Sequence, residues 1–129
     1  MYQLSKRSTK HLNGVHPSLI DVVKLALKIT KVDFGIPNTG GLRTVAQQQE
    51  LYRQELSQLD GVIAKSNHQT GNAFDVFAYV DGKASWDIDD LNEVATAILA
   101  AASQSGVKLV WGGHWKNFVD MPHFELVKP

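Results

Sequence analysis

The sequence contains no cysteine, and this absence excludes several kinds of structure and chemistry at once. No disulfide can stabilise the fold, so the chain is indifferent to the redox compartment. No thiolate is available as a nucleophile or as a metal ligand. Any metal centre in this chain must therefore be built from histidine, aspartate and glutamate side chains.

Excess charge of one sign and long apolar runs are also missing. Thirteen Lys and Arg residues balance thirteen Asp and Glu residues, so no basic excess indicates a nucleic-acid partner. No apolar stretch approaches the roughly 20 residues that span a membrane. Residues 1–17 predict an irregular arm, and the polar, basic start of this arm lacks the apolar core of a signal peptide. We therefore expect a protein made in the cytoplasm that does not insert into a membrane.

A length of 129 residues, 43% of them hydrophobic, predicts a single domain that spans residues 1–129 and buries its own core. The apolar spacing of residues 18–30 and 87–104 predicts two amphipathic helices. Residues 44–59 predict a surface helix capped by Thr44, with its run of glutamines facing solvent. Strands are predicted at residues 32–36, 73–80, 107–111 and 123–127. The order of these elements indicates an α+β fold, a small antiparallel sheet packed with helices.

The most informative segment is residues 66–75, where a histidine and an aspartate flank a glycine turn. Gly71 permits a sharp turn that can fold His68 back towards Asp75. Alternate residues of a strand share a face, so the small Ala73 lies beside Asp75 and leaves room for a ligand. By itself, a histidine and an aspartate at this spacing are usually incidental.

A second segment near the C-terminus supplies another histidine. On the predicted last strand His123 and Glu125 share a face, and His123 can meet His68 and Asp75 if this strand lies near the first. Two imidazoles and one carboxylate leave the fourth position of a tetrahedral ion open for water, which is the ligand arrangement of a catalytic zinc site. Asp120, three residues before His123, lies in the turn that enters the strand.

A carboxylate beside such a centre has a defined task. Zinc lowers the pKa of a bound water from about 15.7 to about 7, and a nearby base then takes the proton and passes it to the leaving amine. Asp120 and Glu125 are both candidates, and their spacing does not separate them. Glu125, on the same strand face as His123, can equally be a metal ligand or a residue that holds a ligand in place. Asp120 and His123 also have ordinary interpretations. Asp120 suits a turn before Met121, and His123 suits a hydrogen-bonded strand end.

The two segments together resemble the zinc peptidases that cleave D-amino-acid-containing peptides of bacterial cell walls. This family comprises VanY-like D,D-carboxypeptidases, D-Ala-D-Ala dipeptidases and L-alanyl-D-glutamate endopeptidases. Its pattern is Ser-x-His-x-x-Gly-x-Ala-x-Asp, then an acidic residue three before a final histidine. The matching residues are Ser66, His68, Gly71, Ala73, Asp75, Asp120 and His123. Residues 4–8, 14–17, 41–44 and 111–115 extend the similarity to the phage endolysin branch.

The resemblance implies a fold like that of the D,D-peptidases and Hedgehog proteins, with one zinc ion per chain. It implies that His68, Asp75 and His123 bind the zinc and that Asp120 is the general base and acid. Arg43 matches the family's substrate-side arginine, which binds a carboxylate or polarises the scissile carbonyl. A guanidinium suits either role because it is always charged and forks onto carboxylates. Without the resemblance, a surface ion pair would be the simpler interpretation of Arg43.

Two further residues are candidates for substrate binding. The endolysin branch commonly has an acidic residue at the position of His114, which in this chain can be a rim residue, a substrate contact or an alternative ligand. A ligand role is the least favoured, because three other ligands already leave the open position that catalysis needs. Ser66 can hydrogen-bond substrate, orient His68 or serve only the turn.

The resemblance therefore implies a zinc-dependent peptidoglycan hydrolase, an endolysin that cleaves the L-alanyl–D-glutamate bond of the stem peptide. Such a protein would be made in the host cytoplasm without a signal peptide, act on the cell wall after release, and work as a monomer. A D,D- or L,D-carboxypeptidase is the alternative, with Arg43 gripping the terminal carboxylate. A non-catalytic wall-binding module is the second alternative.

Overall fold

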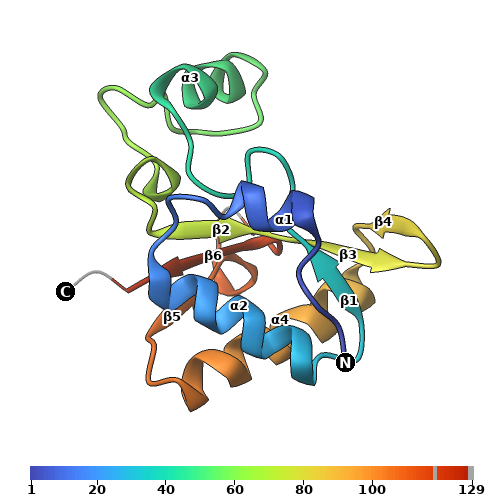
Figure 1. The fold of residues 1–129 in the computed structure, drawn as a ribbon. Helices are drawn as coiled ribbons and strands as arrows, with labels where there is room; N and C mark the ends of the chain where they lie inside the picture. The colour runs from blue at the N-terminus through green and yellow to red at the C-terminus, as the bar shows by residue number, and fades with distance from the viewer. Residues whose placement is uncertain (118, 128–129) are drawn as a thin grey trace.

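Two long helices lie side by side and carry most of the core in the computed structural model, which describes residues 1–117 and 119–127 (Figure 1). Helix α2 spans Pro17–Ile29 and helix α4 spans Ile88–Gln104. Each turns an apolar stripe towards the other, as the sequence spacing predicts. The buried stripe comprises Leu19, Val22, Val23, Ala26 and Leu27 of α2, and Leu91, Val94, Ala95, Ile98, Ala101 and Ala102 of α4.

The ends of α2 and α4 are set by local hydrogen bonds. Before α2, the Nδ1 atom of His16 accepts a hydrogen bond from the Ser18 backbone at 3.1 Å, and Pro17 occupies the first turn, where a missing N–H costs nothing. Before α4, Asp87 accepts from the Asp89 backbone at 3.0 Å. After α4, Gly106 adopts a left-handed φ of 69° that ends the helix. Both predicted helices are thus confirmed almost to the residue.

Two other helices differ from the sequence-based expectation. A short helix α1, Lys6–His11, lies within the predicted irregular arm, because the Ser5 side chain caps it by accepting from the Ser8 backbone. Helix α3, Val45–Arg53, starts after Thr44 as expected but ends six residues before residue 59. Glu55 has a positive φ of 61°, which an α-helix cannot continue through.

The strands form two three-stranded antiparallel sheets where one sheet was expected. The first sheet has the order β1 (Asp33–Gly35), β3 (Phe77–Val80), β4 (Lys83–Ser85). The second has the order β2 (Ala73–Asp75), β6 (His123–Leu126), β5 (Leu109–Trp111). The predicted strand 73–80 is divided at Val76, whose backbone N–H donates to Pro122 O at 3.0 Å. The chain passes from one sheet to the other at that residue.

The pairing of β2 with β6 decides which side chains meet. Phe74 lies opposite Phe124, and both rings are fully buried and stacked with centroids 5.3 Å apart. Because side chains alternate along a strand, the neighbouring pair, Asp75 opposite His123, faces away from this core. One face of β2 and β6 therefore packs into the core through Phe74 and Phe124. The other face presents the Asp75 carboxylate and the His123 imidazole.

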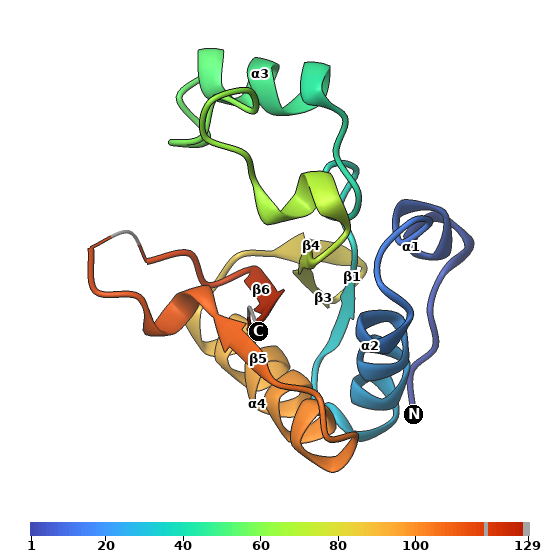
Figure 2. The ribbon, with the colours of Figure 1, turned by 90° about the vertical axis from the view of Figure 1, so that its left-hand side faces the viewer.

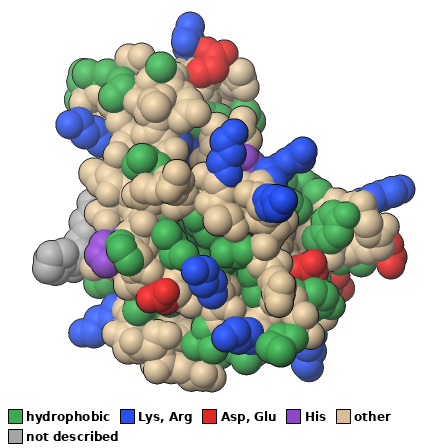
Figure 3. Space-filling model, viewed as in Figure 1, with side chains coloured by type: hydrophobic (Ala, Val, Ile, Leu, Met, Phe, Trp, Pro, Cys, Tyr) green, Lys and Arg blue, Asp and Glu red, His purple; other side chains and the backbone are tan. Residues whose placement is uncertain are grey.

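Residues 44–66, here called the α3 lobe, stand apart from the two-helix body (Figures 1 and 2). Several apolar side chains of this lobe are exposed, among them Tyr52, Leu56, Val62 and Ile63, and green side chains are visible on the lobe at the top of Figure 3. Within the described residues, no helix is both long enough and apolar enough to cross a membrane.

Candidate metal centre and its cavity

Three potential ligand atoms converge at the edge of the second sheet. His68 comes from a 3-10 turn (η1, Asn67–Thr70), Asp75 from the end of β2 and His123 from the start of β6. His68 Nε2 lies 3.2 Å from Asp75 Oδ1, His123 Nδ1 lies 3.0 Å from the same oxygen, and the two nitrogens are 3.2 Å apart. Ligands at about 2.0 Å from a tetrahedral zinc ion are about 3.3 Å from one another. The three residues could therefore hold one metal ion.

His68 is oriented by its own turn. The Ser66 hydroxyl accepts from the His68 backbone at 3.2 Å, and Gly71 ends the turn in the left-handed region with φ 75°. A Cβ at Gly71 would approach Gly14 O to 2.5 Å, so the residue also permits a close contact with the N-terminal segment. The ring donates through Nδ1 to Gly41 O at 2.9 Å. Nε2 is then the nitrogen that faces the centre.

His123 is oriented by Glu125, which the sequence placed on the same strand face, and through Glu125 by Asn67, which no sequence motif pointed to. Its Nε2 donates to Glu125 Oε1 at 2.7 Å, and the other oxygen of Glu125 accepts from the Asn67 side chain at 2.8 Å. Nδ1 of His123 is left facing Asp75. Asn67 lies within the predicted motif but at one of its variable positions, so nothing in the sequence marked it.

The centre attracts positive charge. With both imidazoles neutral, three electron-pair acceptors point at one another, and only a cation or an added proton relieves their repulsion. Without a metal, a proton on His123 relieves the repulsion. Burial lowers the pKa of His123, but its hydrogen bonds with Asp75 and Glu125 outweigh burial and raise this pKa to about 9. Burial likewise raises the pKa of Asp75, but hydrogen bonds from His123 and His68 bring it well below its usual range. The donor set thus fits a divalent cation.

Arg43 fixes the other oxygen of Asp75. Its Nη2 donates to Asp75 Oδ2 at 3.0 Å, its Nε to Thr39 O at 2.7 Å and its Nη1 to Gln48 Oε1 at 3.0 Å. Gln48 is fully buried and donates in turn to Ser57 and to the backbone of Leu59. The expectation that all the glutamines of this helix face solvent is therefore wrong for Gln48, which links the metal centre to the α3 lobe.

A cavity of about 520 Å³ opens in front of the three ligands. The α3 lobe lies on one side of it, and the chain between β5 and β6 lies on the other (Figure 2). The lining residues outside the metal centre are Arg43, Leu56, Ser57, Gln58, Leu59, Lys65, Ser66, Asn67, Trp115, Asp120 and Glu125. His114 is not among them. Its exposed ring packs edge-on against Trp111, with centroids 4.8 Å apart.

The two candidate carboxylates both line the cavity but differ in their hydrogen bonds. Glu125 is engaged by His123 and Asn67, whereas no hydrogen bond reaches the Asp120 carboxylate from the described part of the chain. Burial, and then the charge of Asp75, raise the pKa of Asp120. Its backbone N–H donates to Gly112 O at 3.0 Å, and a Cβ at Gly112 would collide with Asp120 O, so a glycine there allows the close approach.

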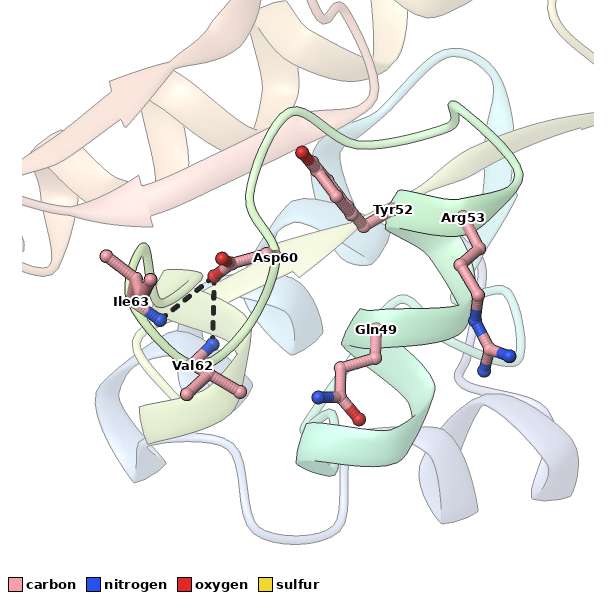
Figure 4. A pocket seen from close by; sticks show the side chains of 6 residues that line it. All are labelled: Gln49, Tyr52, Arg53, Asp60, Val62 and Ile63. Atoms are coloured by element: carbon pink, nitrogen blue, oxygen red, sulfur yellow. Dashed lines mark hydrogen bonds between the residues drawn. The ribbon is translucent and has the colours of Figure 1, made fainter.

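A second hollow of about 570 Å³ lies on the α3 lobe and shares no lining residue with the metal-centre cavity. Figure 4 shows its six residues, with the Asp60 carboxylate turned towards the backbone of the following loop. One oxygen of Asp60 accepts from the N–H groups of Val62, Ile63 and Ala64 at 2.9–3.0 Å. The carboxylate therefore holds the loop that ends at Ser66.

The chain is similar to known proteins over most of its length. The family model described as phage L-alanyl-D-glutamate peptidase matches residues 1–127. The L-alanyl-D-glutamate peptidase of Escherichia phage T5 is 36% identical over 115 residues, which are 88% of this chain and 82% of that protein. The peptidoglycan L-alanyl-D-glutamate endopeptidase CwlK of Bacillus subtilis (strain 168) is 30% identical over 129 residues, covering 89% of this chain and 75% of that protein.

A solved structure shares the fold. The crystal structure of the Serratia marcescens L-Ala D-Glu endopeptidase ChiX superposes with a TM-score of 0.85 at 40% identity, covering 97% of this chain and 90% of that one. Sequence and tertiary structure are thus similar over nearly the full length of the chain. The chain belongs to the phage L-alanyl-D-glutamate peptidase family.

Proposed function

We propose that this chain is a zinc-dependent peptidoglycan hydrolase that cleaves the L-alanyl–D-glutamate bond of the stem peptide. One observation carries the proposal: three ligand atoms 3.0–3.2 Å apart face a cavity that also holds Asp120, a carboxylate without a hydrogen-bond partner among the described residues. The relatives named above are peptidases of that bond. Residues 1–129 would form a single catalytic domain.

In this proposal His68, Asp75 and His123 hold one zinc ion. Nitrogen and carboxylate ligands suit zinc, and three protein ligands leave the open position that distinguishes a catalytic site from a structural one. A zinc ion bound there supplies Lewis-acid chemistry and lowers the pKa of water. The protein's contribution is to fix the three ligand atoms, which it does through Gly41, Glu125 and Arg43.

Asp120 is the proposed general base and acid. It lines the cavity beside the ligands, and its raised pKa brings the carboxyl group closer to the range in which it can both accept and return a proton. Asp120 would take the proton of the attacking water and give it to the leaving D-glutamate nitrogen. Peptide hydrolysis needs both transfers, because the amine leaves poorly unless it is protonated.

Arg43 and Ser66 have proposed supporting roles. Three of the five guanidinium N–H groups of Arg43 are used within the protein, so two remain for a carboxylate or carbonyl oxygen of the substrate. Ser66 lines the cavity but its hydroxyl already accepts from the His68 backbone, which favours orientation of His68 over substrate binding. His114 receives no role in the mechanism.

The proposed partner is the stem peptide of peptidoglycan, and the proposed place of action is the cell wall, reached after release from the host cytoplasm. We propose that the enzyme acts as a monomer. No second chain is needed to complete the centre, since all three ligands and Asp120 come from one chain.

Mass analysis of digested peptidoglycan tests the bond. Purified zinc-loaded protein is incubated with purified stem peptide and with intact peptidoglycan, and the products are weighed. We expect a fragment that ends in L-alanine and a fragment that begins with D-glutamate. Loss of terminal D-alanine without an internal cut would replace the endopeptidase by a carboxypeptidase. No cleavage at all by the zinc-loaded protein would favour a wall-binding module.

A further inference from the structure

Glu125 lies between the two histidine-bearing segments of the centre. Its Oε1 accepts from His123 Nε2 at 2.7 Å, and its Oε2 accepts from Asn67 Nδ2 at 2.8 Å. Asn67 directly precedes His68 in the turn η1. We propose that Glu125 is a positioning residue that selects the ring tautomer of His123 and, through Asn67, sets the separation of the two histidines. This inference rests on the proposed metal site.

The tautomer follows from the chemistry of the two groups. A neutral imidazole has one N–H donor and one lone-pair acceptor, and an ionised carboxylate can only accept. Contact with the Glu125 carboxylate therefore requires that the proton of His123 resides on Nε2. The lone pair is then on Nδ1, the atom 3.0 Å from Asp75 Oδ1 and 3.2 Å from His68 Nε2. The opposite tautomer would present an N–H to a metal.

The strand register explains why Glu125 can reach its partners. Residues two apart on a strand share a face, so Glu125 lies beside His123 and opposite Ala73 in the β2–β6 pair. Ala73 is fully buried and small, and a larger side chain there would occupy the space beside the carboxylate. The Glu125 side chain is only 18% exposed. Solvent therefore weakens its bond to His123 less than it weakens an ordinary surface pair.

Glu125→Ala removes both hydrogen bonds, and Glu125→Gln is its matched control. Glutamine keeps an oxygen that can accept from His123 Nε2, but its amide nitrogen then faces Asn67, whose amide group must turn over to accept from it. Loss of an outer partner of a metal-binding histidine typically weakens metal affinity by about 10–100-fold. We expect a loss in that range for Glu125→Ala and a smaller loss for Glu125→Gln.

A double variant tests the network rather than the residue. Asn67→Asp supplies a carboxylate that accepts from the amide of the glutamine in Glu125→Gln, so the double variant restores both hydrogen bonds and the charge. Asn67→Asp alone places two carboxylates side by side. We expect the double variant to regain most of the zinc affinity that either single variant loses.

Two measurements are made on each protein: zinc affinity by competition with a chelator, and the nitrogen and proton NMR signals of the His123 ring. In the wild-type protein loaded with zinc, we expect a protected Nε2–H and a coordinated Nδ1. In Glu125→Ala, we expect that proton to exchange rapidly. A change in the ring signals alone would not show whether a variant is still folded. Circular dichroism of the metal-free proteins therefore checks the fold of each variant.

The outcomes separate this inference from the proposed function. Weaker zinc binding with a lost Nε2–H signal in Glu125→Ala, and recovery in the double variant, support the positioning role. Wild-type affinity with an unchanged ring spectrum in Glu125→Ala overturns it and leaves the zinc site intact. A wild-type chain that binds no zinc overturns the metal site and the positioning role together.

Discussion

Asp75 and His123 lie directly opposite each other in the antiparallel pair of β2 and β6, with His123 Nδ1 3.0 Å from Asp75 Oδ1. The strand register alone brings these two residues together from 48 positions apart in the chain. The backbone hydrogen bonds of the sheet therefore fix two of the three candidate ligands. The third, His68, is added by a turn rather than by a strand.

We expect His68→Ala to abolish tight zinc binding, because it leaves only two of the three protein ligands. Metal analysis after dialysis measures the effect. His114→Ala is the matched control, since this exposed ring packs against Trp111 outside the cavity. It should keep both its zinc and its activity. Loss of zinc from the His114 variant, with retention in the His68 variant, would contradict the ligand assignment.

Asp120→Ala should keep its zinc and lose hydrolysis. General acid–base catalysis contributes about 10²–10⁴-fold to a rate, so we expect kcat to fall by a factor in that range. Peptide cleavage is followed by mass analysis, and zinc content is measured on the same sample. Cleavage at the normal rate by this variant would show that another group moves the proton.

Metal removal should lower stability. A ligand that binds only the folded state adds about 2.7 kcal/mol when its free concentration is 100 times its Kd. We expect a chelator to lower the thermal unfolding midpoint and added zinc to restore it. The same treatment of His68→Ala provides the control, because its midpoint should not respond to either addition. An equal response of both proteins would point to a metal bound elsewhere.

Gln48→Ala should disturb the α3 lobe and the centre together. The substitution removes hydrogen bonds to Arg43, Ser57 and Leu59. Of these partners the Arg43 side chain is the most buried, and leaving it without this acceptor costs about 1–3 kcal/mol. Denaturant unfolding measures the stability, and peptide cleavage measures the effect on the site. Gln49→Ala, an exposed glutamine of the same helix, should change neither. Equal effects of the two substitutions would refute the link through Gln48.

Comparing Gly71→Ala with Gly82→Ala separates the cost of a positive φ from the cost of a steric clash between the new Cβ and the backbone. Both glycines have positive φ, 75° and 77°, where an ordinary residue costs about 1–2 kcal/mol. A Cβ at Gly82 meets nothing within 4 Å, whereas a Cβ at Gly71 would lie 2.5 Å from Gly14 O. We expect Gly71→Ala to be the more destabilising in denaturant unfolding, and it alone should weaken zinc binding by moving His68. Equal losses of stability would exclude the close contact.

The sequence predicted correctly those helices and turns whose formation depends on neighbouring residues. Helices α2 and α4 follow from the apolar spacing of their residues and from caps such as Asp87. The hairpin at Asp81–Gly82 follows from a turn in which both residues have positive φ. The end of α3 was missed, because the left-handed backbone of Glu55 just after the helix is not marked by a glycine or an asparagine.

Residues 66–75 and 120–125, taken together with the family resemblance, predicted that His68, Asp75 and His123 converge, and the structure brings their ligand atoms together. Their spacing did not reveal which of Asp120 and Glu125 is engaged by the protein. Tertiary structure decided that, by placing Asn67 and His123 on either side of Glu125 and leaving Asp120 in the cavity. The physical reason is that a hydrogen bond depends on distances of about 3 Å, and only the folded chain brings such distant residues that close.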